Sequence, residues 1–217
     1  MSVSVFADPG AFVESPSANG APVLNEEESD DNVKITAYRN RADELNATQI
    51  TEFENAYKEI VAVDDLTVLV SSLTSVAENV NVDAADLAVS DLFYVSLESG
   101  QDHTEGAKYA LSIQADTFTN FICLLHFVDG EWKIVPEVEL KGTKVIEFTA
   151  ENLGTYAVVV SVGDAPEYPE VPVDDDGVSP WVVVGIVTAG CAVVAGISLI
   201  VVIVYKSRHE KDEKEEK

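Results

Sequence analysis

The sequence predicts an α+β fold with an antiparallel, sandwich-like β region, an N-terminal strand and helical hairpin packed on it, and one C-terminal transmembrane helix. Three observations predict this fold. Apolar residues recur with helical period soon after residue 46, short β-rich segments separated by turn residues follow, and residues 181–205 form an uninterrupted apolar run. With 217 residues, the chain is long enough for one ordinary domain and additional segments.

The expected domain, residues 33–162, begins with a short strand. Over residues 33–38 apolar and polar residues alternate, which is the pattern of a half-buried strand. The preceding residues 8–32 are rich in Pro, Ser, Gly, Asn and acidic residues, so we expect them to form a disordered acidic arm.

Two consecutive helices are predicted next. Asn46 or Thr48 caps the first helix, and Asp64 or Asp65 begins the second. The first helix has an apolar stripe of Ile50, Phe53, Ala56, Tyr57, Ile60 and Val63. The second has a stripe of Leu66, Leu69, Val70, Leu73, Val76 and Val80. The two stripes are expected to close against each other as a helical hairpin.

A β-hairpin over residues 121–135 is the clearest element of the β region. Asp129-Gly130 between two β-rich runs is a strong two-residue hairpin signal. This turn pairs Phe127 with Trp132 and Leu125 with Ile134. The first strand is apolar on both faces, which indicates a central strand. Further strands are expected at residues 91–97, 109–115, 145–149 and 157–162.

The predicted core contains large side chains from both the helices and the hairpin. Those expected to be buried are Phe53, Tyr57, Leu69, Leu73, Leu125, Phe127, Trp132 and Ile134.

The apolar run of residues 181–205 is long enough to cross a bilayer as one helix. A Pro- and Asp-rich stalk, residues 163–180, precedes it, and a charged tail, residues 206–217, follows it. Lys206, Arg208 and Lys211 directly after the run place the tail in the cytoplasm and the N-terminal region outside. A stripe of small residues offers weak self-association or is ordinary transmembrane composition: Gly185, Ala189, Ala192 and Gly196.

Residues 1–7 resemble the end of a signal peptide that is truncated at its start. Val5 and Ala7 are the small residues that signal peptidase reads, so Met1 is expected to be internal and cleavage to follow Ala7. The alternative is an ordinary disordered N terminus.

The acidity of the chain restricts the classes of partner that it can bind. The net charge is −26, from 13 Lys+Arg against 39 Asp+Glu, and the tail from Lys206 onward is balanced. The charge therefore belongs to the region before the membrane, which excludes nucleic acid as a partner. A cationic partner or calcium is allowed, but a solvated surface that keeps the exposed protein soluble explains the charge better. The expected partners are the bilayer and an extracellular protein or glycan.

No catalytic, cofactor-binding or metal-binding residue is predicted, so the chain is not expected to be an enzyme. His103, His126 and His209 are too scattered for a ligand set, and His126 is expected to be a satisfied core or edge histidine. Cys123 and Cys191 are expected to be small buried hydrophobes that do not pair. The acidic clusters lack the spacing of a calcium loop: Asp64-Asp65, Asp83 with Asp86, and Asp174-Asp175-Asp176. Asn46-Ala47-Thr48 fits a glycosylation acceptor that has no meaning in most bacterial proteins.

Three segments carry a resemblance to a known kind of domain. They read DLAVSDLFYVSL, NFICLLHFVDGEWKIVPEVEL and FTAENLGTYAVVV. They are similar to a membrane-proximal domain of unknown function in surface proteins of clostridial-type Gram-positive anaerobes. The resemblance implies a fold and a place outside the cell, and no activity. Residues 178–181, VSPW, depart from the sortase signal of many such proteins, so the chain is expected to stay in the membrane.

The expected function is that of a membrane-anchored bacterial cell-surface protein, single-pass in the cell membrane, acting as an extracellular interaction module. The alternative is a structural stalk, or a remnant of a larger surface protein, with no ligand of its own. An exposed apolar patch would favour binding, and a uniformly acidic surface without such a patch would favour the stalk.

Overall fold

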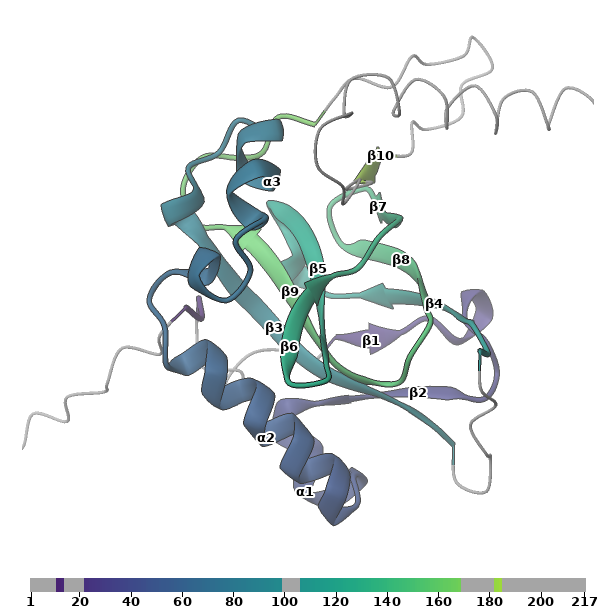
Figure 1. Cartoon of the computed structure of the whole chain (residues 1–217). Helices are drawn as coiled ribbons and strands as arrows, with labels where there is room; N and C mark the ends of the chain where they lie inside the picture. Colours follow the sequence, from purple (N-terminus) through teal and green to yellow (C-terminus); the bar gives the residue numbers. More distant parts are fainter. Residues whose placement is uncertain (1–10, 14–21, 99–105, 169–181, 185–217) are drawn as a thin grey trace, which may run out of the picture. The chain divides into compact units, whose positions relative to one another are not determined.

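Two antiparallel sheets and a few helices form a mixed α+β fold (Figure 1). The computed structural model describes residues 11–13, 22–98, 106–168 and 182–184. One sheet, here sheet A, has the order β2 (Val33–Ala37), β3 (Leu87–Leu97), β9 (Gly154–Ser161), β5 (Phe121–Val128) and β6 (Glu131–Ile134). The other, sheet B, has the order β1 (Val23–Leu24), β4 (Tyr109–Gln114), β8 (Val145–Ala150), β7 (Val138–Lys141) and β10 (Val182–Val184). The α-helices are α1 (Arg41–Glu44), α2 (Ala47–Val61) and α3 (Leu73–Asn79).

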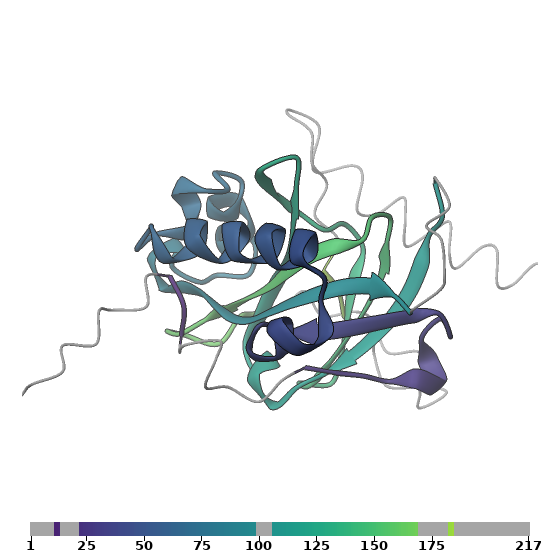
Figure 2. The same cartoon turned by 90° about the horizontal axis from the view of Figure 1, so that it is seen from below.

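Sheet A is covered on both faces. Alternate residues of β3 point to opposite sides, so Phe93 and Val95 enter the core shared with sheet B, while Tyr94 contacts Phe53 of α2. Strand β4 of sheet B contributes Leu111 and Ile113 to the same core. Figure 2 shows α2 on the side of the domain away from the β1 and β4 strands. The central-strand prediction for β5 is confirmed, because β5 lies between β9 and β6.

Helix α2 begins where the sequence predicts. Asn46 is the N-cap, and its side chain accepts hydrogen bonds from Thr48 N at 3.0 Å and Gln49 N at 3.1 Å. The Gln49 side chain accepts from Asn46 N at 3.0 Å, which completes a capping box. The buried face of α2 consists of Phe53, Ala56 and Ile60.

The second predicted helix is shorter than expected. The prediction of a long helical hairpin is therefore wrong for its second helix. Residues 66–68 form the 3-10 turn η3 (Leu66–Val68), and α3 begins only at Leu73. β-branched Thr67 and Val68 and the serines at 71 and 72 are poor helix formers, which accounts for the break. The apolar stripe is nevertheless turned inward, since Leu66, Val70, Leu73, Val76 and Val80 are all buried.

The β5–β6 hairpin is confirmed with its predicted turn and register. Asp129 and Gly130 have φ of 55° and 79°, as a type I′ turn requires. Phe127 pairs with Trp132 and Leu125 with Ile134. Of the eight side chains expected in the core, five are buried: Phe53, Leu73, Leu125, Phe127 and Trp132. The other three are half-buried: Tyr57, Leu69 and Ile134.

The N-terminal arm is not wholly disordered, contrary to the prediction. Phe12 is buried, forms a bridge with Val89 and contacts the Tyr57 ring at 5.6 Å between centroids. Leu24 and its neighbour in β1 pair with β4. The few apolar residues of this acidic segment find partners that are distant in the sequence, so composition alone could not reveal them.

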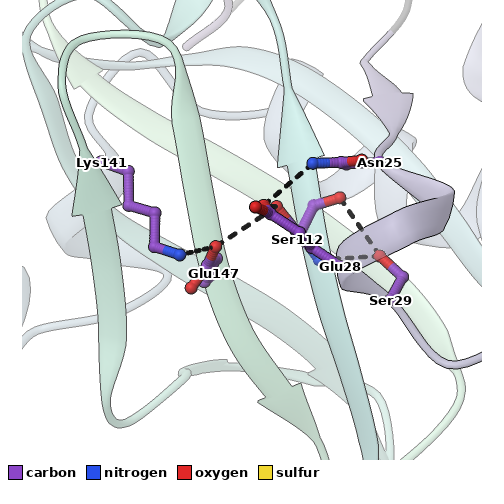
Figure 3. A network of polar contacts seen from close by, with 6 residues as sticks. All are labelled: Asn25, Glu28, Ser29, Ser112, Lys141 and Glu147. Atoms are coloured by element: carbon purple, nitrogen blue, oxygen red, sulfur yellow. Dashed lines mark hydrogen bonds and ion pairs between the residues drawn. The ribbon is translucent and has the colours of Figure 1, made fainter.

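A polar network fastens this N-terminal segment to sheet B (Figure 3). Ser112 Oγ contacts Glu28 Oε2 at 3.1 Å and Glu147 Oε1 at 3.5 Å. Lys141 forms an ion pair with Glu147, and Asn25 donates to Glu28 at 2.9 Å. Ser112 is fully buried, so the network stabilises the attachment of residues 25–29 and offers no reachable nucleophile.

The first part of the predicted stalk packs against the domain. Glu167 N donates to Val80 O at 2.8 Å, and the Tyr168 hydroxyl donates to Phe121 O. Residues 182–184, expected within the transmembrane helix, are described as strand β10 beside β7. Valine favours strands, and β7 offers the edge. The rest of the predicted stalk, span and tail lies outside the described residues, as do residues 1–7 and the small-residue stripe.

Candidate functional site

An open groove of about 900 Å³ lies between helix α2 and the closed end of the β5–β6 hairpin. We name it the α2–hairpin groove. Its α2 wall consists of Ala47, Thr48, Thr51, Glu52, Asn55, Lys58 and Glu59, and its hairpin wall of Phe127 and Gly130. Burial raises the pKa of Glu59 above the ordinary value, so this wall is partly shielded from water.

A row of residues in register across sheet A passes beneath α2. Thr36 pairs with Tyr94, Tyr94 with Thr155, Thr155 with Phe127, and Phe127 with Trp132. Because paired residues of neighbouring strands share a face, these five side chains lie on the α2 side of the sheet. The Phe127 and Trp132 rings contact each other at 5.2 Å between centroids, and they support the hairpin wall of the groove.

Glu52 joins α2 to this row. The Tyr94 hydroxyl donates to Glu52 Oε2 at 3.0 Å. Burial, and then the neighbouring Glu52 carboxylate, raise the pKa of Tyr94 well above its ordinary value, so Tyr94 remains a hydrogen-bond donor at physiological pH. One carboxylate oxygen of Glu52 is therefore held by the sheet.

The other oxygen of Glu52 and the Nε2 atom of His126 both lie close to Gly154. A Cβ atom at position 154 would lie 3.0 Å from Glu52 Oε1 and 3.4 Å from His126 Nε2. Gly154 has a φ of 130°, which side chains rarely adopt. The missing side chain and the unusual backbone at this position let a carboxylate and an imidazole approach the same point.

His126 is buried, with 8% of its surface exposed, and it stacks on Tyr156 at 4.4 Å between ring centroids. Its ring donates a hydrogen bond to the backbone of Leu153, while Nε2 has no hydrogen-bond partner. The donating nitrogen is therefore Nδ1, and Nε2 of the neutral ring is an acceptor. The prediction of a fully satisfied core histidine is wrong for this one atom.

Burial lowers the pKa of His126 below its ordinary value of 6.5, and nearby Lys133 adds to the effect. Unfolding allows this imidazole to take a proton below pH 6.5. We therefore expect the free energy of unfolding to fall as pH decreases below 6.5, by up to roughly 1.4 kcal/mol per pH unit, until the folded-state pKa is reached. His126→Gln should remove this slope. Urea denaturation at several pH values measures it, and equal slopes in both chains would contradict the assignment.

Sheet A contains three further buried polar atoms of this kind. Thr155 Oγ1, Trp132 Nε1 and Ser96 Oγ are buried and have no hydrogen-bond partner. Thr155 and Trp132 belong to the row beneath α2, so unsatisfied polar atoms gather under the groove. Buried polar groups are normally satisfied, and a cluster of exceptions is typical of a ligand site or a site of ordered water.

The acidic clusters considered in the sequence have local roles. Asp65 accepts from Thr67 N at 2.8 Å and caps the 3-10 turn η3, whereas the helix predicted to begin there starts only at Leu73. Asp83 accepts from Ala85 N at 2.9 Å and caps the 3-10 turn η4 (Ala84–Asp86). In the part of the chain that the structure describes, no three His, Cys, Asp or Glu residues are grouped to hold a metal ion. Asp174-Asp175-Asp176 lies outside it.

Of the two cysteines, only Cys123 lies among the described residues. Cys123 is a free, buried thiol in β5, and burial raises its pKa far above the ordinary value. It is a small core residue, as predicted. Cys191, His103 and His209 lie outside the described residues.

The sequence analysis missed Glu52, Tyr94, Gly154 and Thr155. A signal for part of the site was present, since a histidine inside an apolar strand and a glycine at the first position of a strand are both unusual. Nothing in the sequence pointed to Glu52 as a site residue, because it is an ordinary polar residue of an amphipathic helix.

Comparisons of the chain with models of protein families, with curated proteins and with solved structures give no match. Among the residues described, none of the helices has the length and apolar character needed to cross a membrane.

Proposed function

We propose that the chain is a membrane-anchored cell-surface protein of a Gram-positive, clostridial-type bacterium, and that its extracellular domain is an interaction module. The apolar run of residues 181–205 and the basic residues after it support the anchor and the orientation. The three segments that resemble membrane-proximal domains of such surface proteins support the source and the location.

The α2–hairpin groove is the observation that carries the binding function. It combines an accessible polar helix face with a hairpin wall held by packed aromatic rings. Beneath it lie buried polar atoms that lack partners. Each such atom costs about 1–3 kcal/mol of stability unless water or a ligand satisfies it, so these atoms support a binding site.

Binding rather than catalysis is proposed. The side chains that line the groove include no histidine or cysteine, and the thiol of Cys123 is buried in β5. The groove thus offers recognition by hydrogen bonds and charge.

Filling the groove tests the proposal. Thr51 is exposed on α2 and lines the groove, so Thr51→Arg places a long side chain in it. Saturable capture of the full chain by bacterial envelope or host-matrix fractions is expected to weaken by a factor of about ten or more. Thr74→Arg is the matched control, because Thr74 is an exposed helical threonine of α3 that does not line the groove.

Equal capture of the Thr51→Arg and Thr74→Arg chains would show that the groove is not the binding site. Equal thermal stability of the two variants shows that the loss comes from the groove and not from unfolding.

A structural stalk is the second candidate, and one observation favours it. The exposed large hydrophobic residues of the described chain come from separate segments: Val13, Val23, Val68 and Val162. They are scattered along an acidic chain, which fits a solvated spacer better than an apolar docking surface. Absence of saturable capture by any fraction, with the domain folded, would support the stalk.

A further inference from the structure

We infer that the edge of β3 beside the end of α2 is a docking site for an extended peptide segment, and that it takes residues 11–13 of a second copy of this chain. In the structure the site holds the chain's own residues 11–13. We name it the β3-edge slot, formed by Tyr57 and Ile60 of α2 and Val89 of β3. These three residues are not among those that line the α2–hairpin groove.

The backbone of the slot matches an extended peptide. Strand β2 pairs with β3 only from Phe93 onward, so the earlier part of this edge is left to another segment. Val89 N donates to Ala11 O at 2.7 Å, and Val13 N donates to Val89 O at 3.0 Å. Ala11 N also donates to Ile60 O at 3.4 Å. This is the pattern of a strand added to a sheet edge, where main-chain hydrogen bonds supply the affinity.

The side chains of the seated segment show what the slot selects. Ala11 is 4% exposed and Phe12 is 5% exposed, whereas Val13 is 43% exposed. The Phe12 ring lies 5.6 Å from the Tyr57 ring, which stacks on Tyr38 at 4.4 Å between centroids. The slot therefore takes a small residue followed by an aromatic one, and its third position is open to solvent.

The segment joins its own domain in a way that permits exchange. Phe12 pairs with Val89 in parallel, whereas the pairings between the named strands of the described chain are antiparallel. No tight hairpin therefore ties the segment to β3. Residues 14–21 connect it to β1, which pairs with β4 in sheet B. This connection spans up to about 30 Å when extended, so the segment can enter a neighbouring slot while β1 stays paired.

A second copy supplies the segment whose fit the structure shows. Exchange of an identical element between two copies keeps each contact, so it is a low-cost route to a dimer. Under the proposed membrane anchor, copies share one membrane, which raises the concentration of the second segment near the slot. The concentration step rests on the proposed function, and the fit of the segment does not.

The experiment pairs two complementary variants of the full chain in detergent solution. Phe12→Ala weakens the segment and keeps the slot, whereas Tyr57→Ala weakens the slot and keeps the segment. The two chains carry different fluorophores, and energy transfer between them measures association. An equimolar mixture is expected to associate about tenfold or more tightly than either variant with itself, because one intact segment meets one vacant slot.

Tyr109→Ala is the matched control for Tyr57→Ala. Tyr109 is a half-buried tyrosine of β4, outside the slot. Its chain keeps both segment and slot, so its own segment competes for its release, and its mixture with Phe12→Ala should associate more weakly. Association of the Tyr57→Ala mixture no tighter than that of this control, or than that of either variant with itself, would overturn the inference.

A competing peptide tests the specificity. The acetylated amide of residues 9–15, PGAFVES, is expected to dissociate the mixture saturably. Val13→Lys in the peptide should leave competition about unchanged, because this position faces solvent. Ala11→Arg in the peptide should abolish it, because this position is buried. Equal competition by all three peptides would show that the association does not use the slot, and would overturn the inference.

The folding of the variants is followed by circular dichroism. Ala11→Arg in the chain replaces Phe12→Ala if that chain does not fold, and failure of both to fold would show that the segment is an inseparable part of the core, against the inference. If the mixture associates while Thr51→Arg and Thr74→Arg are captured equally, the slot stands and the groove fails. If the mixture does not associate while Thr51→Arg loses capture, the proposed function stands and the slot alone fails.

Discussion

Replacing Phe53 with alanine is expected to lower the free energy of unfolding by about 3–5 kcal/mol. Phe53 is completely buried, and its ring contacts Tyr38 at 5.2 Å and Tyr94 at 5.7 Å between centroids. These contacts join α2 to the outer face of sheet A. Truncation removes the transfer free energy of the ring and leaves a cavity that the surrounding aromatic residues cannot fill. Chemical denaturation followed by tryptophan fluorescence measures the loss.

Asn55→Ala is the matched control for this prediction. Asn55 is exposed on the same helix, two residues from Phe53, so its truncation removes no core contact. The change should stay within about 0.7 kcal/mol, the range of helix propensities. A Phe53→Ala loss no larger than that of the control would mean that α2 does not pack on sheet A.

Gly154→Ala is expected to cost about 1–3 kcal/mol from backbone strain, and further free energy from its side-chain contacts. At a φ of 130° an alanine is strained, and its Cβ would lie 3.0 Å from Glu52 Oε1. Gly130→Ala is the comparison for strain without side-chain contacts, because Gly130 has a φ of 79° and no atom within 4 Å of the added Cβ. Thermal denaturation of the two variants gives the difference.

A double-mutant cycle completes this test. Glu52→Ala removes the side chain that the new Cβ would contact, so it should recover part of the loss in the Gly154→Ala chain. Strict additivity of the two substitutions would show that Glu52 does not approach Gly154.

Local chemistry made some elements predictable from the sequence. The Asp129-Gly130 turn fixes the register of its hairpin without help from the rest of the chain, and the Asn46 cap fixes the start of α2 in the same way. The break between Leu66 and Leu73 was missed because the apolar period continues through it. Periodicity shows which side of a segment is buried. Whether the segment is helical also depends on the helix propensity of residues such as Ser71 and Ser72.

Tertiary pairing made the rest unpredictable. Phe12 is buried through partners on α2 and β3, far along the chain, so an acidic and polar segment concealed an anchoring residue. The candidate site has the same origin. Glu52, His126 and Gly154 come from three elements, and only the order of strands in sheet A and the position of α2 over it bring them together.

The strand order of sheet A has a consequence for how the chain folds. Its long central strand β3 pairs on one side with β2 and on the other with β9, the last strand of the sheet in the sequence. Pairings between such distant segments must close large loops before they gain contacts, so they form slowly. Sheet A closes only after Ser161 has left the ribosome. Until then the apolar strands β3 and β5 lack their common partner β9, which leaves them open to aggregation.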